Sequence, residues 1–206
     1  MTTLLVIAKE PRPGRVKTRL TPPFTPAQAA ALAEAALVDT LRAVAAAPAK
    51  RRVLVLDGRP GPWLPDGFEV VPQCSGGLDE RLADAFSRCT GPALLVGMDT
   101  PHLTPGLLNL DFTDCDARFG PAEDGGFWAL GLARPEPGLL RGVPMSVPET
   151  GSVQRERLTA AGLRVRELPR LRDVDTAADA RAVAALAPDT AFAARLAALT
   201  HPGAAA

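Results

Sequence analysis

In the first hundred residues, short uninterrupted apolar runs alternate with longer segments of helical periodicity. The runs LLVIA (4–8), RVLVLD (52–57) and PALLVGMD (92–99) are typical of strands buried on both faces. Between the first two, residues 25–47 repeat leucine and alanine near every 3.6 positions, behind a Thr-Pro pair suited to a helix start. This alternation predicts βαβ units and a mainly parallel sheet.

The rest of the chain continues the α/β pattern with one change. Residues 116–132 read as two adjacent strands around a glycine-containing turn, which indicates an antiparallel element in the second half. We expect further strands at 68–73 and 163–168, helices at 78–88, 151–161, 175–187 and 190–199, and a helical turn at 104–110. The fold class is therefore α/β, with helices on both faces of a mainly parallel central sheet.

Neither a repeat nor a low-complexity linker divides the chain. We expect a single domain over residues 1–200 and a flexible C-terminal tail at 201–206. The 23 basic and 23 acidic residues balance, so no global field favours nucleic acid or an anionic membrane, and any anion site must be local. Without a signal peptide, a membrane-spanning run or a disulfide or zinc pattern among the cysteines, we expect a cytoplasmic protein.

A strongly cationic loop, AKEPRPGRVKTRL (8–20), follows the first predicted strand. Its basic residues are Lys9, Arg12, Arg15, Lys17 and Arg19. Arginine presents a planar fork to phosphate and lysine a compact charge, while Gly14 lets the backbone approach a ligand closely. The loop matches no standard phosphate-binding motif, so a solvated basic loop is the alternative. Because ligands of parallel sheets bind beyond the carboxyl ends of strands, its position favours an anion site.

Carboxylates gather at other predicted strand ends and loops. Asp99 closes the strongest predicted strand, Asp173 and Asp175 precede a helix, and Glu123 and Asp124 precede two glycines. Each has an ordinary alternative as a turn or helix-capping residue. Together with the basic loop they suit a phosphorylated ligand held partly through a divalent cation, since Mg²⁺ commonly uses one or two carboxylates plus phosphate oxygens.

Four blocks carry a resemblance to a known family: AKEPRPGRVKTRL, GMDTPHLTP, GPAEDGGFWALGL and LRDVDTAADA. They resemble, in content and order, the signature blocks of a small bacterial glycosyltransferase-like family, some of whose members are linked to arsenosugar biosynthesis. That family belongs to the GT-A-type nucleotide-diphospho-sugar transferase superfamily, together with molybdenum-cofactor guanylyltransferase and 2-phospholactate guanylyltransferase. The resemblance runs from Leu4 to about Leu186 and implies a single-domain Rossmann-like GT-A fold.

The resemblance also implies where a nucleotide would bind. The loop after the first strand would wrap the base and phosphates, with Ala8 and Lys9 near the nucleotide. Lys17 and Arg19 would face the phosphates and assist catalysis by stabilising charge on the leaving group. Arg81, in a block similar to Q-x-G-G-D-L-G-E-R, would contribute to nucleotide or substrate binding.

The remaining implied roles concern the metal and the acceptor. Asp99 stands where the superfamily has its metal-binding aspartate, and Asp175 where a second is often found, so Mg²⁺ or Mn²⁺ is the expected cofactor. Asp124, Gly125 and Gly126 lie where the acceptor or sugar is read, and Asp124 would orient the acceptor nucleophile.

The chain departs from the family pattern at two places. His102 stands where a D-x-P-D motif would have an acid, which bears on metal affinity; as a lone loop histidine it is either a general base or incidental. In the block QCSGGLDERLADAF (73–86), which resembles Q-x-G-G-D-L-G-E-R, Gly77 replaces the expected acid and Asp79 the expected glycine, which bears on the acceptor pocket.

The sequence therefore predicts a metal-dependent glycosyltransferase that takes a sugar from a nucleotide-diphospho-sugar to a small acceptor. The first alternative is a guanylyltransferase-like nucleotidylyltransferase that releases pyrophosphate from a nucleoside triphosphate. The second is a nucleotide-binding protein without catalysis. The Ala/Leu-rich last helix could supply a homodimer surface.

Overall fold

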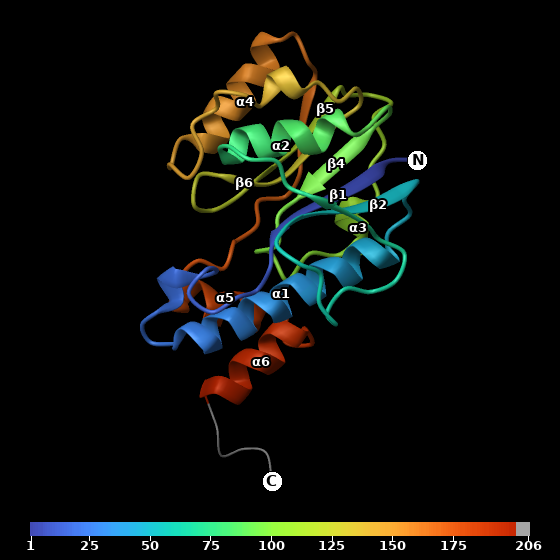
Figure 1. The fold of residues 1–206 in the computed structure, drawn as a ribbon. Helices are drawn as coiled ribbons and strands as arrows, with labels where there is room; N and C mark the ends of the chain where they lie inside the picture. The colour runs from blue at the N-terminus through green and yellow to red at the C-terminus, as the bar shows by residue number, and fades with distance from the viewer. Residues whose placement is uncertain (201–206) are drawn as a thin grey trace.

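The computed structural model describes residues 1–200, and a seven-stranded sheet forms its centre (Figure 1). The strands are β1 (Thr3–Lys9), β2 (Arg51–Asp57), β3 (Glu69–Pro72), β4 (Ala93–Val96), β5 (Ala117–Pro121), β6 (Phe127–Leu132) and β7 (Val165–Glu167). Their order across the sheet is β3-β2-β1-β4-β6-β5-β7. The predicted tail at 201–206 lies outside the described residues.

Six α-helices and two 3₁₀ turns surround this sheet over residues 1–200. The helices are α1 (Pro26–Ala46), α2 (Leu78–Ser87), α3 (Pro105–Leu108), α4 (Thr150–Ala160), α5 (Ala177–Leu186) and α6 (Ala191–Thr200), and the 3₁₀ turns are η1 (Thr18–Leu20) and η2 (Pro137–Leu139). No helix in this part of the chain is long and apolar enough to cross a membrane.

The sheet is parallel except around β6. The pairs β1–β2, β1–β4, β2–β3 and β5–β7 are parallel, whereas β6 runs antiparallel to both β4 and β5. The connection between β5 and β6 is short enough to allow only an antiparallel return. The predicted mainly parallel sheet with an antiparallel element is confirmed.

Each face of the sheet has its own apolar core, because successive strand residues point to opposite faces. Leu4 and Val6 of β1 pack in one core cluster with Leu37 of α1. Leu5, between them, packs in the other with Leu82 of α2 and Leu158 of α4. Figure 1 shows α1 on one side of the sheet and α2 and α4 on the other. Helices on both faces are thereby confirmed.

Helix α6 packs on α1, α5 packs on α6, and the three helices share a third apolar cluster. The side chains of Phe192 and Leu196 on α6 are buried there. Asp39 of α1 accepts hydrogen bonds from the backbone N–H groups of Ala191 and Phe192, at 3.0 and 2.8 Å, and so satisfies free donors at the start of α6. The apolar side of the last helix is used within the chain, and the homodimer stays a prediction.

One predicted strand is shorter than expected, and this changes where Asp99 lies. The strand expected over 92–99 ends at Val96, so Asp99 stands in the loop beyond β4 rather than on the strand. The Gly97 N–H still donates to the carbonyl of Trp128 at 3.2 Å, but the Asp99 carbonyl accepts from Val174 N–H at 3.0 Å. The backbone at Asp99 therefore pairs with the segment before α5, which brings that segment to the sheet edge.

Candidate active site

A cavity of about 840 Å³ opens at the carboxyl ends of β1 and β4. Its walls come from the loop after β1, the loop after β4, the start of β6, the segment before α4, the start of α2 and the segment before α5. The predicted site residues that line it are Ala8, Lys9, Lys17, Arg19, Arg81, Asp99, Asp124, Gly126 and Asp175. The fold thus gathers most of the predicted site residues into one space.

Lys17 is the centre of the polar end of this cavity. Its Nζ lies 3.0 Å from Oδ2 of Asp99 and 3.0 Å from Oδ1 of Asp175, and its side chain is only 8% exposed. Burial, the largest single effect, favours the neutral amine, but the two carboxylates outweigh it and raise the pKa of Lys17. The two aspartates predicted as metal ligands are therefore bridged by a buried ammonium.

The backbone of Lys17 has φ 48° and ψ 41°, in the left-handed region that non-glycine residues seldom occupy. Strain of this kind persists where surrounding contacts hold it, often at functional sites. Here the two ion pairs of the ammonium hold the side chain inward.

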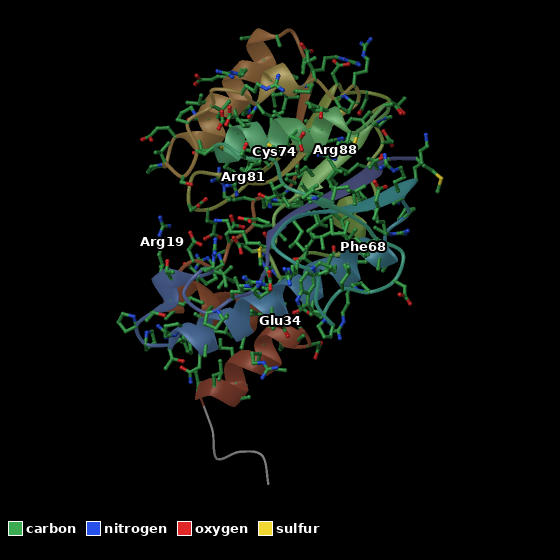
Figure 2. The ribbon with its side chains drawn as sticks, viewed as in Figure 1. Arg19, Glu34, Phe68, Cys74, Arg81 and Arg88 are labelled. Carbon is green, nitrogen blue, oxygen red and sulfur yellow. The ribbon has the colours of Figure 1, made fainter. Side chains whose placement is uncertain are left out.

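Arg19 and Asp175 form the outer part of the polar end. Arg19 Nη1 lies 3.2 Å from Oδ2 of Asp175, and the arginine side chain is 71% exposed. Although burial acts to raise the pKa of Asp175, Lys17 and Arg19 lower it overall, so this carboxylate is ionised. Figure 2 shows Arg19 and Arg81 between α1 and α2 in the view of Figure 1. Arg19 is free to turn toward a phosphate at little cost.

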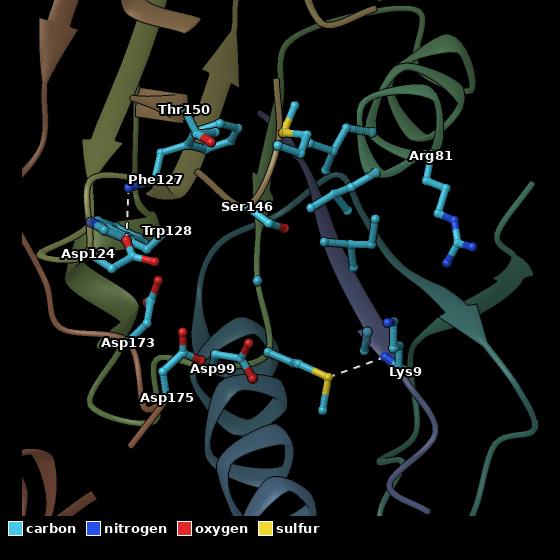
Figure 3. Close-up of a pocket in the computed structure, with 18 of the residues that line it drawn as sticks. Lys9, Arg81, Asp99, Asp124, Phe127, Trp128, Ser146, Thr150, Asp173 and Asp175 are labelled. Atoms are coloured by element: carbon cyan, nitrogen blue, oxygen red, sulfur yellow. Dashed lines mark hydrogen bonds between the residues drawn. The ribbon is translucent and has the colours of Figure 1, made fainter. Parts of the chain in front are cut away.

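Asp173 adds a third carboxyl group beside Asp99 and Asp175 (Figure 3). It accepts a hydrogen bond of 2.9 Å from the hydroxyl of Thr100. Burial, followed by the charge of Asp99, raises the pKa of Asp173 to about 7. Sequence reasoning paired Asp173 with Asp175 without separating them; the structure makes Asp175 the ion-pair partner and Asp173 a carboxyl that holds its proton near neutral pH.

Arg81 lines the cavity from α2, on the side away from Asp99, Asp173 and Asp175, and its side chain extends toward Lys9 (Figure 3). Its Nη1 lies 3.3 Å from Oδ2 of Asp57 and 3.2 Å from Oε1 of Gln73. The Gln73 amide in turn donates to the carbonyl of Ala8 at 2.7 Å. Sequence reasoning missed Gln73, although it directly follows β3 and the search for polar residues at strand ends would have found it.

Two of the predicted glycines do not line the cavity. Gly125, with φ +89°, accepts a hydrogen bond of 2.8 Å from the Gly151 N–H, and a side chain there would collide with the carbonyl of Pro148. The glycine is needed to seat the β5–β6 turn against the start of α4. Gly14, with φ +75°, has open space around the position of a side chain, so its backbone conformation alone favours glycine.

Asp124, next to Gly125, does line the cavity. Its Oδ1 accepts a hydrogen bond of 2.8 Å from the Gly126 N–H, which fixes the carboxylate at the mouth of the turn. The carboxylate stands between the acidic cluster and Phe127 in Figure 3.

A second, smaller cavity of about 540 Å³ adjoins the first on the side of β2. Lys9 and Arg15 line both cavities, and Arg12 and Arg59 line only the smaller one. Arg12 Nε lies 2.7 Å from Oε1 of Glu10. The basic loop therefore presents charge to two neighbouring spaces, and Arg15 lines both of them.

The residues at which the chain departs from the family pattern do not line the cavity. Asp79, the shifted acid, accepts a hydrogen bond of 2.7 Å from the Gly142 N–H and so anchors the segment after η2. Gly77 is the residue before α2 and donates its N–H to Oε2 of Glu80 at 2.9 Å. His102 does not line the cavity; burial lowers its pKa, and its Nδ1 is buried without a partner among residues 1–200.

The polar end suits a divalent cation in its donor chemistry. Carboxylate oxygens are the ligands that Mg²⁺ and Mn²⁺ take, and the Lys17 ammonium shows that Asp99 and Asp175 share one cation. Within residues 1–200, no group of three histidine, cysteine or acidic side chains is arranged to hold a metal. A metal there would need oxygens from its ligand as well, and the predicted Asp99 and Asp175 site stays a prediction.

The seven-stranded sheet and the cavity at its carboxyl edge match structures of nucleotide-using transferases with the nucleotide-diphospho-sugar transferase fold. The chain belongs to the DUF2064 family, described as uncharacterized proteins conserved in bacteria, whose model matches residues 29–147. A provisionally named nucleotide-diphospho-sugar transferase from Desulfovibrio desulfuricans G20 matches at TM-score 0.84 and 26% identity, over 95% of this chain and 94% of that one. No curated protein matches the sequence.

More distant structures share the fold. CMP:2-keto-3-deoxy-manno-octonic acid synthetase, solved with CTP, matches at TM-score 0.56 and 14% identity, over 90% of this chain and 98% of that one. Rv0371C from Mycobacterium tuberculosis H37Rv, solved with manganese, matches at TM-score 0.52 and 22% identity, over 88% and 96%. The predicted superfamily and fold class are confirmed.

Proposed function

We propose that this protein is a glycosyltransferase that moves a sugar from a nucleotide-diphospho-sugar to a small acceptor. The observation that carries the proposal is the convergence of Lys17 and Arg19 with Asp99 and Asp175 at one end of the cavity. Paired opposite charges at the carboxyl edge of a parallel sheet suit a diphosphate, which needs cationic partners and a ligand position for its counter-ion.

In this proposal the basic loop binds the diphosphate. Lys17 and Arg19 exchange their aspartate partners for phosphate oxygens, and Arg81 with Lys9 borders the nucleotide. The two cations stabilise the negative charge that grows on the diphosphate as the bond to the sugar breaks. Because the Lys17 side chain is only 8% exposed, its effect on that charge exceeds what an ammonium would give in water, whereas the exposed Arg19 acts in solvent.

Asp99 and Asp175 would hold Mg²⁺ or Mn²⁺ once Lys17 turns to the phosphates. A divalent cation at this place, when bound, supplies charge neutralisation for the diphosphate. The carboxylate donors at the polar end support this, and the manganese bound to the distant relative Rv0371C agrees with it.

Asp124 would orient the acceptor. An acceptor hydroxyl attacks the anomeric carbon, the bond from that carbon to the phosphate oxygen breaks, and the nucleoside diphosphate leaves with the electron pair. The hydroxyl proton passes to Asp124 or to water beside it. One oxygen of Asp124 is held by the Gly126 N–H, which leaves the carboxylate aimed at a fixed point of the cavity.

The smaller cavity favours a second candidate, nucleotidylyl transfer. It shares Lys9 and Arg15 with the main cavity and adds Arg12 and Arg59, so the two spaces together offer cations for a longer phosphate chain. A nucleoside triphosphate would then be attacked at its α-phosphate and would release pyrophosphate. The third candidate, nucleotide binding without catalysis, requires only that a nucleotide binds in the cavity.

The test begins with a thermal-shift screen of nucleoside triphosphates and nucleotide-diphospho-sugars, with and without Mg²⁺ and Mn²⁺. The Asp99→Ala variant should lose metal-dependent nucleotide binding in calorimetry, whereas Asp66→Ala, at an exposed residue outside the cavity, should bind as the wild type does. Equal metal-dependent binding by both variants would overturn the role of Asp99.

Product analysis then separates the candidates. Release of nucleoside diphosphate from a sugar nucleotide in the presence of acceptor supports glycosyl transfer, and release of pyrophosphate from a triphosphate supports nucleotidylyl transfer. Tight binding without turnover over a broad acceptor panel would leave the non-catalytic candidate.

A further inference from the structure

The end of the main cavity away from the acidic cluster is apolar. Its walls include Ile7 at the end of β1, Leu78 and Leu82 on α2, Phe127 at the start of β6, and Met145 and Val147 on the segment before α4. In Figure 3, Phe127 and Thr150 lie at this end, across Asp124 from Asp99, Asp173 and Asp175. The cavity therefore has a charged, acidic end and an apolar end, with Asp124 between them and Arg81 of α2 beside the apolar wall.

This apolar end is an uncovered extension of the core between the sheet and α2. Leu82 belongs to that core, and Ile7, Phe127 and Met145 pack against it without being fully buried. Leu78 and Val147 are 43% and 39% exposed, although both are large hydrophobic residues. Soluble proteins seldom gather such side chains in a concave surface unless a ligand covers them.

Gly97 keeps this space open. It follows β4 on the face that carries Leu95, and it lines the cavity. A side chain at Gly97 would meet nothing within 4 Å, so the space above it is empty of protein atoms. The missing side chain at Gly97 therefore contributes to the opening.

Ser146 places one polar group at the apolar end (Figure 3). Its backbone has φ 61°, in the left-handed region, and its side chain is exposed. Its hydroxyl makes no hydrogen bond to other groups in the part of the chain that the structure describes, whereas the neighbouring Thr150 hydroxyl donates to the Pro144 carbonyl at 2.9 Å. The hydroxyl of Ser146 is thus available to a ligand.

We infer that the apolar end binds the acceptor and that the acceptor is a small molecule with an apolar body and a polar group that pairs with Ser146. This inference rests on the proposed function in one respect: the nucleotide occupies the charged end, so the apolar end is left to the acceptor. An acceptor seated there presents its reacting hydroxyl toward Asp124, between the two ends. The competing occupant is the nucleobase, whose flat faces are also apolar.

The neutral fluorescent probe N-phenyl-1-naphthylamine tests the site, because it has no charge to attract the basic loop. The probe should bind the wild type, and a series of n-alkanols from butanol to octanol should displace it with affinity rising about fourfold for each methylene group. Ser146→Ala should weaken octanol binding about three- to tenfold and leave the probe's own affinity unchanged.

Two substitutions should prevent probe binding at the apolar end, and a third controls for the effect of adding a negative charge. Val147→Asp should weaken probe binding about tenfold or more, because a carboxylate would then stand in the apolar wall. Val70→Asp is the matched control: Val70 is 37% exposed on β3 and does not line the cavity, so its variant should bind as the wild type does. Gly97→Leu places a large side chain in the open space beside residue 97 and should also abolish probe binding.

The outcomes distinguish this inference from the proposed function. Probe and UDP-glucose or CTP bound together support an acceptor site, whereas mutual displacement overturns it in favour of the nucleobase. Equal probe binding by the Val147→Asp and Val70→Asp variants, or failure of the alkanols to displace the probe, would also overturn it. If the probe binds but no nucleotide does, the apolar binding site is supported and the proposed function is contradicted.

Discussion

The two ends of the cavity meet their ligands in opposite ways. At the charged end, Lys17, Asp99 and Asp175 already satisfy one another, and a nucleotide must exchange those ion pairs for its own. At the apolar end, Leu78 and Val147 have no cover, and a ligand would only add contacts. We expect substitutions at the charged end to change the stability of the free protein, and substitutions at the apolar end to change ligand binding alone.

The largest loss of stability is expected at Lys17. Lys17→Met would leave Asp99 and Asp175 without their shared ammonium, and removing one partner of a largely buried ion pair is strongly destabilising. Since both carboxylates are still partly open to water, we expect a loss of about 2–3 kcal/mol in the free energy of unfolding. Urea denaturation measures this loss.

Lys50→Met is the control for Lys17→Met, because Lys50 is exposed and should change the free energy of unfolding by less than about 0.5 kcal/mol. With Lys17 gone, Mn²⁺ should bind more tightly, because it no longer competes with the ammonium. If the Lys17→Met variant has the same free energy of unfolding as the wild type, the charged and apolar ends of the cavity do not differ in their effect on stability.

Asp173 should make stability depend on pH. Its pKa is raised from 3.8 to about 7, so the folded protein keeps a proton that the unfolded chain has released. Stability from this group is therefore full below the unfolded pKa and falls as pH rises from about 4 to about 7. Asp173→Asn removes this loss of stability, so the free energy of unfolding of the variant relative to the wild type should be about 4 kcal/mol higher at pH 8 than at pH 4.

Urea denaturation at both pH values checks the prediction for Asp173, with Asp66→Asn as the exposed control. An equal difference between variant and wild type at the two pH values would contradict the raised pKa.

The smallest effect on stability is expected at Arg19. Its ion pair with Asp175 is exposed, and such pairs contribute about 0.2–1 kcal/mol. Arg19→Gln should stay within that range in urea denaturation yet weaken nucleotide binding in calorimetry severalfold, because the guanidinium is lost as a phosphate partner. A large loss of stability with unchanged nucleotide affinity would reverse the role that we give to Arg19.

Some features could be predicted from the sequence because they depend on local pattern. The continuous apolar runs of β1, β2 and β4 identified buried parallel strands, and the Thr-Pro start of α1 identified its first residue. The basic loop and the carboxylates were identified by their positions just after predicted strands, since strand ends of a parallel sheet share one edge.

Other features depend on contacts between distant segments, and no local pattern reports them. Lys17 and Asp175 are separated by 158 positions in the chain and meet only because the Asp99 loop pairs with the segment before α5. Gly125 was expected at the acceptor, but its place against Pro148 shows only in three dimensions. The apolar end was missed because Ile7, Leu78 and Val147 look like ordinary core residues until the packing leaves them uncovered.

By itself, the sequence determined the alternation of strands and helices, the edge of the sheet that carries charge, and the residue types gathered there. These depend on periodicity and on the direction of parallel strands, which are local properties. Only the tertiary structure decided which charges neutralise one another, which carboxyl keeps its proton and which apolar side chains stay open. Those depend on burial and distance, which arise when remote segments pack together.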